Sequence, residues 1–253
     1  MILGEWKRRR RERYLRRNRP DESLWQVTLG QVRAASHLGP EDRSRLRDLS
    51  MLLLREKSVE AAGGLELSGG MRLRIACEAC VPILNLGLEL YRGWYSIVVY
   101  PGEFIARHEY ADETGVVHST RDVLSGEAWE QGPVIIAWDE VVASDPDVSV
   151  IIHEMAHKLD LLDGCINGRP PLHAGMDAGA WSSAFNRAYS SHVARVESGR
   201  ETVIDPYAAE EPGEFFAVVS EAFFMIPQEL SRIWPKVYDQ LALYYRQQPA
   251  EAS

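Results

Sequence analysis

The chain has few cysteines and no long apolar run. Only Cys77, Cys80 and Cys165 occur in 253 residues, and so small and odd a number cannot build a disulfide framework for a chain of this length. The apolar stretches around 81–90 and 148–152 fall far short of the roughly 20 residues that a membrane-spanning helix needs. The sequence therefore predicts neither a disulfide-stabilised nor a transmembrane protein.

The sequence also lacks a secretion signal. The opening MILGEW is followed by a basic run, with no apolar segment after the positive charges and no small-residue cleavage site. An odd number of cysteines is typical of a reducing compartment. We therefore expect a cytoplasmic protein whose folded body has no membrane partner.

Positive charge is scarce outside the first residues. The chain carries −9, but residues 1–19 hold nine Lys and Arg against Glu5 and Glu12, which gives them +7 and leaves −16 on residues 20–253. Nucleic acid binding needs clustered positive charge on a folded face, so we expect no direct nucleic acid binding by the folded body. Blocks of like charge usually stay solvated. We predict that residues 1–19 form a flexible basic tail, with a nucleic acid or an anionic lipid left open as its partner, and that residues 20–253 form a single domain.

Hydrophobic periodicity indicates the secondary structure. The predicted helices cover 43–57, 71–90 with a break near Pro82, 148–162, 181–196, 208–225 and 230–245. The predicted strands cover 95–100, 104–110 and 132–138. The sequence thus predicts a mainly helical protein with a small mixed sheet in the middle of the chain.

The predicted helix 148–162 contains the sequence His-Glu-Met-Ala-His. His153 and His157 are four residues apart, so both imidazoles project from one helix face and can reach one metal ion. Glu154 lies beside the first histidine, where its carboxylate can take a proton from a water molecule that the metal polarises. Lys158 is charged where many zinc peptidases have an uncharged residue. Because leaving a buried polar group without partners costs roughly 2–7 kcal/mol, this otherwise apolar helix predicts a metal centre of the metallopeptidase type.

A catalytic zinc ion usually has three protein ligands, so a third must come from elsewhere. The compact three-histidine pattern is excluded, because it needs Gly at position 160 and His at position 163, where this chain has Asp160 and Asp163. In the predicted helix 208–225, Glu214 and Glu221 lie seven residues apart on one face of an apolar segment. Periodicity alone does not say which of the two binds the metal.

Other polar residues receive lesser roles. We expect Asp160 to accept a hydrogen bond from a ligand histidine. His173 and His192 are formally possible ligands, but we interpret both as ordinary surface histidines. Cys77 and Cys80 lie in an apolar helical segment without a second cysteine pair, so we interpret them as buried small side chains rather than as a zinc or redox site.

Together these motifs resemble a known family. The segments HEMAHKLD and DPYAAEEPGEFFAVVSEAFF are similar to the zinc peptidases of the Mlc titration factor A family, which are distant relatives of the anthrax lethal factor catalytic domain. The similarity extends to EWKRRRR, LRDLSMLLLREK, YPGEF and GPVIIAWDEV, and so covers nearly the whole chain. It implies a compact, zincin-like α+β fold.

The resemblance also implies roles for individual residues. It gives one catalytic Zn2+ a ligand set of His153, His157 and Glu214. Glu154 is then the general base, and Tyr207 supplies a phenol that can donate a hydrogen bond to the oxyanion of a tetrahedral intermediate. Glu221 is left with a supporting role.

The function that follows from the resemblance is peptide hydrolysis. It implies a zinc-dependent peptidase with an aminopeptidase-like preference, in which zinc-activated water attacks the peptide bond with Glu154 as general base. In some bacteria, family members also bind Mlc, a glucose-responsive transcriptional repressor. The alternative is a non-catalytic regulator that sequesters a transcription factor and uses zinc mainly for structure. For a peptide substrate, we expect docking along residues 133–138 by main-chain hydrogen bonds.

Overall fold

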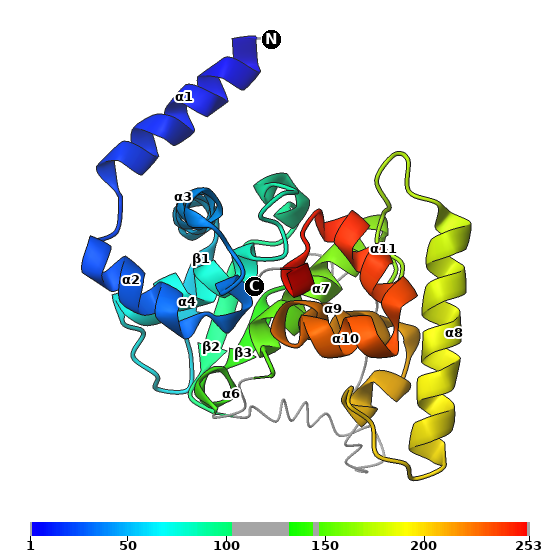
Figure 1. Ribbon diagram of the computed structural model, residues 1–253. Helices are drawn as coiled ribbons and strands as arrows, with labels where there is room; N and C mark the ends of the chain where they lie inside the picture. Colours follow the sequence, from blue (N-terminus) through cyan, green and yellow to red (C-terminus); the bar gives the residue numbers. More distant parts are fainter. Residues whose placement is uncertain (1, 103–131, 144–146, 252–253) are drawn as a thin grey trace, which may run out of the picture.

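The structure is a computed structural model that describes residues 2–102, 132–143 and 147–251 (Figure 1). Its α-helices are α1 (Ile2–Arg17), α2 (Glu22–Gln31), α3 (Pro40–Glu56), α4 (Gly69–Cys80), α6 (Trp138–Val142), α7 (Val150–Asp160), α8 (Ala178–Glu197), α9 (Pro212–Met225), α10 (Pro227–Ile233) and α11 (Pro235–Tyr245). Its strands are β1 (Ser58–Ala61), β2 (Ser96–Tyr100) and β3 (Val134–Ala137). Short 3-10 helices are η1 (Arg33–Ala35), η2 (Leu88–Tyr91), η3 (Leu161–Asp163), η4 (Pro206–Ala209) and η5 (Pro249–Glu251).

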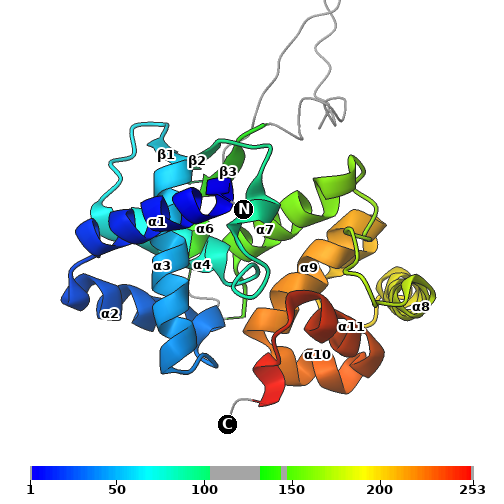
Figure 2. The same cartoon turned by 90° about the horizontal axis from the view of Figure 1, so that it is seen from above.

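The helix α7 lies between two groups of elements. Helices α2, α3 and α4 lie with the sheet on one side of it, and helices α8 to α11 lie on the other (Figure 2). Helix α7 packs most extensively against α9, and it also contacts α4 and β3. The residues of α7 are therefore held from both sides, which suits a helix that has to carry a precisely positioned site.

The sheet is parallel throughout the described residues. Its strand order is β1-β2-β3, with Val59 paired to Ile97 and Ile97 paired to Val134. We expected a mixed sheet, and none of the described strand pairs is antiparallel. The expected strand at 104–110 lies outside the described residues, while β1 was not expected because its four residues, Ser-Val-Glu-Ala, are too short and too polar to stand out.

Prolines divide the expected helices into shorter ones. The helix expected over 71–90 ends as α4 at Cys80, because Val81 still has helical dihedrals but Pro82 after it has no amide hydrogen to continue the helical hydrogen bonds. Pro212 and Pro235 each occupy a first helical position, where the missing amide hydrogen costs nothing, and so begin α9 and α11 as separate helices. Within the described residues, none of the helices combines the length and the apolar character needed to cross a lipid bilayer.

The basic N-terminal segment forms helix α1, where we expected an irregular tail. Arg11 bridges the carboxylates of Glu56 and Glu89 at 3.0 and 3.1 Å, and Tyr14 and Leu15 pack against the hydrophobic core. Apolar periodicity could not predict these contacts, because two adjacent apolar side chains and one arginine do not form a repeating pattern. The division into a tail of residues 1–19 and a domain of residues 20–253 remains a prediction.

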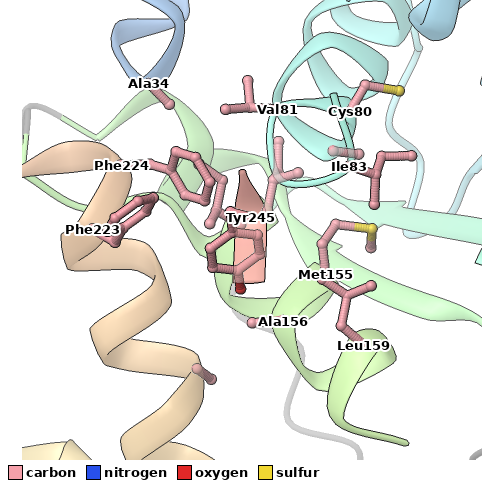
Figure 3. Close-up of a cluster of buried hydrophobic side chains, with 14 of the residues drawn as sticks. Ala34, Cys80, Val81, Ile83, Met155, Ala156, Leu159, Phe223, Phe224 and Tyr245 are labelled. Carbon is pink, nitrogen blue, oxygen red and sulfur yellow. The ribbon is translucent and has the colours of Figure 1, made fainter. Parts of the chain in front are cut away.

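The buried face of α7 forms the centre of the core. Met155 and Leu159 of α7 are completely buried, and Figure 3 shows them in one cluster with Phe223 and Phe224 of α9 and with Tyr245 of α11. At 100° per residue, the apolar side chains of α7 point away from its two histidines. Burial of each large side chain contributes about 1.5–3 kcal/mol, so the face opposite the histidines fixes the rotation of α7.

The loop that follows α7 is pressed against the start of α9. Gly168 has φ of +75°, and a Cβ placed there would lie 2.4 Å from the carbonyl oxygen of Pro212. The amide of Gly168 donates to Asp160 Oδ2 at 2.7 Å, and its carbonyl accepts a bond from the indole of Trp181 at 3.3 Å. This close approach sets the distance between the end of α7 and the first turn of α9.

Replacing Gly168 should therefore destabilise the protein more than replacing a glycine that has the same left-handed backbone conformation but no close neighbour. Gly199→Ala is the matched control, because Gly199 has φ of +66° but no atom near the added Cβ. We expect Gly199→Ala to lower the free energy of unfolding by about 1–2 kcal/mol, and Gly168→Ala by a further 1 kcal/mol or more. Urea denaturation of both variants measures the difference, and equal losses would contradict the close packing of this loop on α9.

Candidate metal centre

Helix α7 begins at a capped end and carries two histidines on one face. The Ser149 hydroxyl accepts a hydrogen bond from the amide of Ile152 at 3.3 Å, which satisfies one of the free amides of the first turn. One turn further on, the Nε2 atoms of His153 and His157 approach to 3.1 Å. The two rings stand nearly perpendicular, at 77°, so their Nε2 atoms converge on one point in front of the helix.

Glu214, in the first turn of α9, adds a carboxylate to the two imidazoles. Its Oε2 atom lies 3.2 Å from His153 Nε2 and 3.4 Å from His157 Nε2. All three side chains are between 15% and 17% exposed, so solvent still reaches them and they are not enclosed in the core. Periodicity left Glu214 and Glu221 open as third ligands, the family resemblance implied Glu214, and the structure brings Glu214 to the histidine pair.

These three donor atoms fit a metal ion. Nitrogen and oxygen ligands bind zinc at 2.0–2.1 Å, which in a tetrahedral arrangement places them roughly 3.3–3.4 Å apart, close to the 3.1–3.4 Å observed. The Oε2 atom of Glu214 is buried without a well-formed hydrogen bond among the described residues. A cation at the point of convergence would satisfy it, because it attracts the carboxylate and both nitrogen lone pairs.

The charge of the surrounding groups also favours a cation. Burial alone would lower the pKa of His153, but its contacts with Glu214 and Glu221 outweigh burial and raise that pKa to about 10. Burial alone would raise the pKa of Glu214, but the two histidines hold that pKa well below its ordinary value. Without a metal, the carboxylates thus retain a proton on an imidazole, and a bound metal ion would replace that positive charge.

Glu221, seven residues after Glu214, lies on the other side of His153. Its Oε2 atom is 3.6 Å from His153 Nδ1, and its Oε1 atom accepts a hydrogen bond from the backbone amide of Ser149 at 2.7 Å. The Ser149 hydroxyl in turn donates to buried Glu78 at 2.9 Å, and Glu78 pairs with Arg74 at 3.0 Å. Sequence reasoning missed Ser149 and Glu78, although the position of Ser149 just before the apolar helix is typical of an N-cap.

Asp160 does not have the role that we expected. Its Oδ2 atom accepts hydrogen bonds from the amides of Asn167 and Gly168 at 2.9 and 2.7 Å, and among the described residues no hydrogen bond joins it to a histidine. Burial raises the pKa of Asp160 to about 6, against the effect of these amides. Asp160 therefore anchors the loop after α7 through Oδ2, while its Oδ1 atom is buried without a hydrogen bond among the described residues.

Tyr207 lies beside the metal centre on η4. Its ring centroid is 6.2 Å from that of His153, and the side chain is partly exposed. The Asp205 carboxylate caps this short helix by accepting from the amide of Tyr207 at 2.8 Å. His192, almost completely buried on α8, has its Nε2 atom 3.0 Å from the carbonyl oxygen of Asp205. The expectation of a surface position for His192 is thus wrong, and its ring supports the turn that carries Tyr207.

The remaining candidate residues lie away from the three donor atoms. His173 Nε2 is 2.8 Å from the carbonyl oxygen of Tyr244, and the two rings stack. Cys77 and Cys80 are completely buried, and burial raises the pKa of the Cys77 thiol to about 12. A thiol with so high a pKa does not supply the thiolate that a metal or redox site needs. The structure therefore agrees with their interpretation as buried side chains.

Glu154 and Lys158 are two further charged residues of α7, and Lys158 is buried. Glu154 is half-buried and follows His153 directly, and its charge acts on both His153 and Lys158. The Lys158 ammonium donates to the carbonyl oxygen of Gly132 at 3.0 Å, just before β3. The lysine that departs from the usual zinc-peptidase pattern thus ties α7 to the sheet.

Comparison with known proteins places this arrangement in a family. Residues 5–246 match the glucose-regulated metallo-peptidase family M90. The chain belongs to the M90 family. The match covers every element of the candidate metal centre, from α7 to α9.

Relatives in the M90 family have similar lengths. The Mlc titration factor A of Klebsiella pneumoniae strain 342 is 32% identical over 91% of this chain and 88% of the relative. The protein of the same name from Salmonella arizonae is 34% identical over 90% of this chain and 92% of the relative. Membership of the M90 family makes the chain a hydrolase of the metallopeptidase type, and the group of His153, His157 and Glu214 is compatible with the metal that such an enzyme uses.

Binding of a divalent ion to this group should stabilise the fold. Zn2+ added to chelator-treated protein is expected to raise the melting temperature, and at about 100 times its Kd it should add about 2.7 kcal/mol to the free energy of unfolding. Glu214→Ala should abolish most of this gain. Glu221→Ala, which removes a contact of His153 and the acceptor of the Ser149 amide, should weaken binding about 10–100-fold.

Glu201→Ala is the matched control for this experiment, because Glu201 is exposed and lies outside the metal centre. It should respond to Zn2+ as the wild type does. Loss of the response in Glu221→Ala but not in Glu214→Ala would show that the third ligand is Glu221.

Proposed function

We propose that this protein is a zinc-dependent peptidase with His153, His157 and Glu214 as the ligands of one Zn2+ ion. The observation that carries the proposal is the convergence of three donor atoms to within 3.1–3.4 Å of one another, with Glu154 next to His153 on α7. Two imidazoles and one carboxylate are a usual ligand set of catalytic zinc in peptidases. Three protein ligands leave one coordination position for water or substrate, whereas a structural site usually has four.

The chain's own residues supply the proton transfers. A bound zinc ion would supply a Lewis acid that polarises the peptide carbonyl and lowers the pKa of water. Glu154 takes the proton of the attacking water as general base and then delivers it to the nitrogen of the leaving amine. Its place directly after His153 keeps its carboxylate next to the ligand set without making it a ligand.

Tyr207 and Glu221 have different supporting roles in this proposal. The phenol of Tyr207, on the same side of α7 as His153, donates a hydrogen bond to the oxyanion that forms when the carbonyl is attacked. The Glu221 carboxylate, 3.6 Å from His153 Nδ1, favours a proton on Nδ1 and so leaves the lone pair on Nε2 for the metal. Ser149 holds Glu221 in place through its backbone amide.

An extended peptide is the proposed substrate. We further propose that the enzyme prefers to cleave at the amino terminus of the peptide, as an aminopeptidase does. Strand β3 pairs with β2 on one side and with no described strand on the other, and Ile135 is 39% exposed. Main-chain hydrogen bonds along this edge would place the peptide beside α7, because α7 packs against β3 and Lys158 joins them.

The edge-strand hypothesis predicts protection from hydrogen exchange. A peptide-like inhibitor should slow exchange of the β3 amides at 134–137, because a docked strand takes up main-chain groups that otherwise face solvent. The amides of β1 at 58–61, on the far edge of the sheet, serve as the internal control and should not change. Unchanged exchange in β3 on saturation with the inhibitor would exclude this docking mode.

A second function is favoured by the relatives' name, Mlc titration factor A. We propose that this chain also binds the transcriptional repressor Mlc, in which case it regulates transcription in addition to cleaving peptides. The alternative is a regulator without catalysis, whose zinc serves mainly for structure. The three-donor site with Glu154 beside it supports the catalytic version. A cytoplasmic location suits both and rests on the cysteine content of the sequence.

Glu154→Gln separates these functions. It should retain one zinc ion per chain and the wild-type fold, but lower kcat for peptide hydrolysis about 10²–10⁴-fold, because the amide cannot accept the proton of water. Binding to purified Mlc should be unchanged. Elemental analysis, cleavage of free and N-blocked peptides, and calorimetry with Mlc measure the three properties.

Glu229→Gln is the matched control, and Tyr207→Phe is a second test variant. Glu229 is exposed on α10, so its variant should behave as the wild type does, while Tyr207→Phe should keep zinc and lose part of kcat. Wild-type cleavage rates in Glu154→Gln would disprove the role of Glu154, and zinc binding without any cleavage by the wild type would leave the purely regulatory function.

A further inference from the structure

Helix α1 separates its side chains into a docked face and an exposed face. Arg11, Tyr14 and Leu15 contact the body. The carboxylates of Glu56 and Glu89 form ion pairs with Arg11 and neutralise its charge. Among the α1 side chains that the structure describes, the exposed arginines are Arg9, Arg10, Arg13, Arg16 and Arg17. At 100° per residue, these five fall within an arc of roughly 120° that lies opposite the docked face.

The five arginines form a continuous cationic stripe. From Arg9 to Arg17 the stripe is about 12 Å long, at 1.5 Å per residue. Trp6, 63% exposed, lies in the same arc, and the guanidinium of Arg10 stands 5.7 Å from the centre of its ring. In Figure 1 the N-terminal end of α1 points away from the rest of the molecule, so the stripe projects outward from a body that is strongly acidic.

We propose that this stripe binds the phosphate backbone of a nucleic acid. Arginine forms bidentate hydrogen bonds with phosphate oxygens, and five guanidiniums on one side of a single helix match a row of phosphates along a duplex. The acidic body repels the polyanion, and only the outward position of α1 keeps the stripe clear of that repulsion.

An anionic membrane is the less suitable partner. A helix that lies in a membrane interface needs an apolar face to bury among the lipids. Tyr14 and Leu15 are already packed on the body, and among the α1 side chains that the structure describes only Trp6 is apolar on the exposed face. The contact is therefore electrostatic, and a duplex offers its phosphates at regular spacing along a line, as the stripe of arginines requires.

The test is fluorescence anisotropy of the full-length chain with a labelled DNA duplex. If the stripe neutralises about five phosphates, the logarithm of the binding constant should fall with the logarithm of salt with a slope of about −4.5, or roughly 500-fold between 50 and 200 mM. Replacing all five arginines with glutamine, which keeps helix propensity, should abolish this binding. Replacing them with lysine should preserve the salt slope at lower affinity.

A control variant carries the same loss of charge elsewhere. Five exposed arginines of the body, changed to glutamine, should leave DNA binding unchanged; these are Arg43, Arg187, Arg195, Arg200 and Arg232. Circular dichroism and zinc content should be the same in all variants, because no changed residue belongs to the metal centre.

Three results would overturn the proposal. The first is that the wild type does not bind DNA at 50 mM salt. The second is that the variant without the stripe binds DNA as the wild type does, and the third is that the body control loses as much DNA affinity as the stripe variant. Displacement of the duplex by phosphatidylserine vesicles at the same phosphate concentration would assign the stripe to a lipid surface instead.

Discussion

The packing of α7 against α9 is the contact on which the metal centre depends. The two histidines come from one helix and need only helical geometry to converge, but Glu214 comes from a helix that starts more than fifty residues later in the chain. Met155, Leu159, Phe223 and Phe224 fill the space between the two helices on the side away from the histidines. Their burial fixes the rotation of both helices, and so it fixes the distances of 3.2 and 3.4 Å from Glu214 to the two imidazoles.

Carboxylates surround the histidine pair more closely than an ordinary protein surface would tolerate. Glu214 faces the Nε2 atoms, Glu221 faces Nδ1 of His153, and the charge of Glu154 acts on the same ring. Such an arrangement is stable only with positive charge at its centre, which a proton on His153 or a metal ion can provide. The site is thereby tuned to hold a cation while Glu154 stays outside the ligand set. A group of side chains that can hold a cation is compatible with membership of a metallopeptidase family.

Two further sets of contacts hold Glu214 and Tyr207 in position. The Asp160 carboxylate and the close approach of Gly168 to Pro212 join the loop after α7 to the first turn of α9. His192 and the Asp205 cap hold the turn that bears Tyr207. None of these residues belongs to the three-donor group, yet each sets the position of one that the mechanism uses. The net charge of the chain is also divided between two parts, because the positive charge lies on α1 while the body is acidic.

The sequence by itself determined the elements that rest on local patterns. The His-Glu-Met-Ala-His segment, the helical periodicity of α3, α7 and α8, and the strands β2 and β3 follow from residue spacing within short stretches. Only the tertiary structure places Glu214 against the Nε2 atoms of both histidines and Glu221 against Nδ1 of His153, because both carboxylates lie on one face of α9 and their positions depend on how that helix crosses α7. The same holds for Asp160, His192 and α1, whose partners are backbone groups or side chains distant in the sequence. Spacing along a chain specifies which side chains share a face, but only packing between distant segments specifies what that face meets.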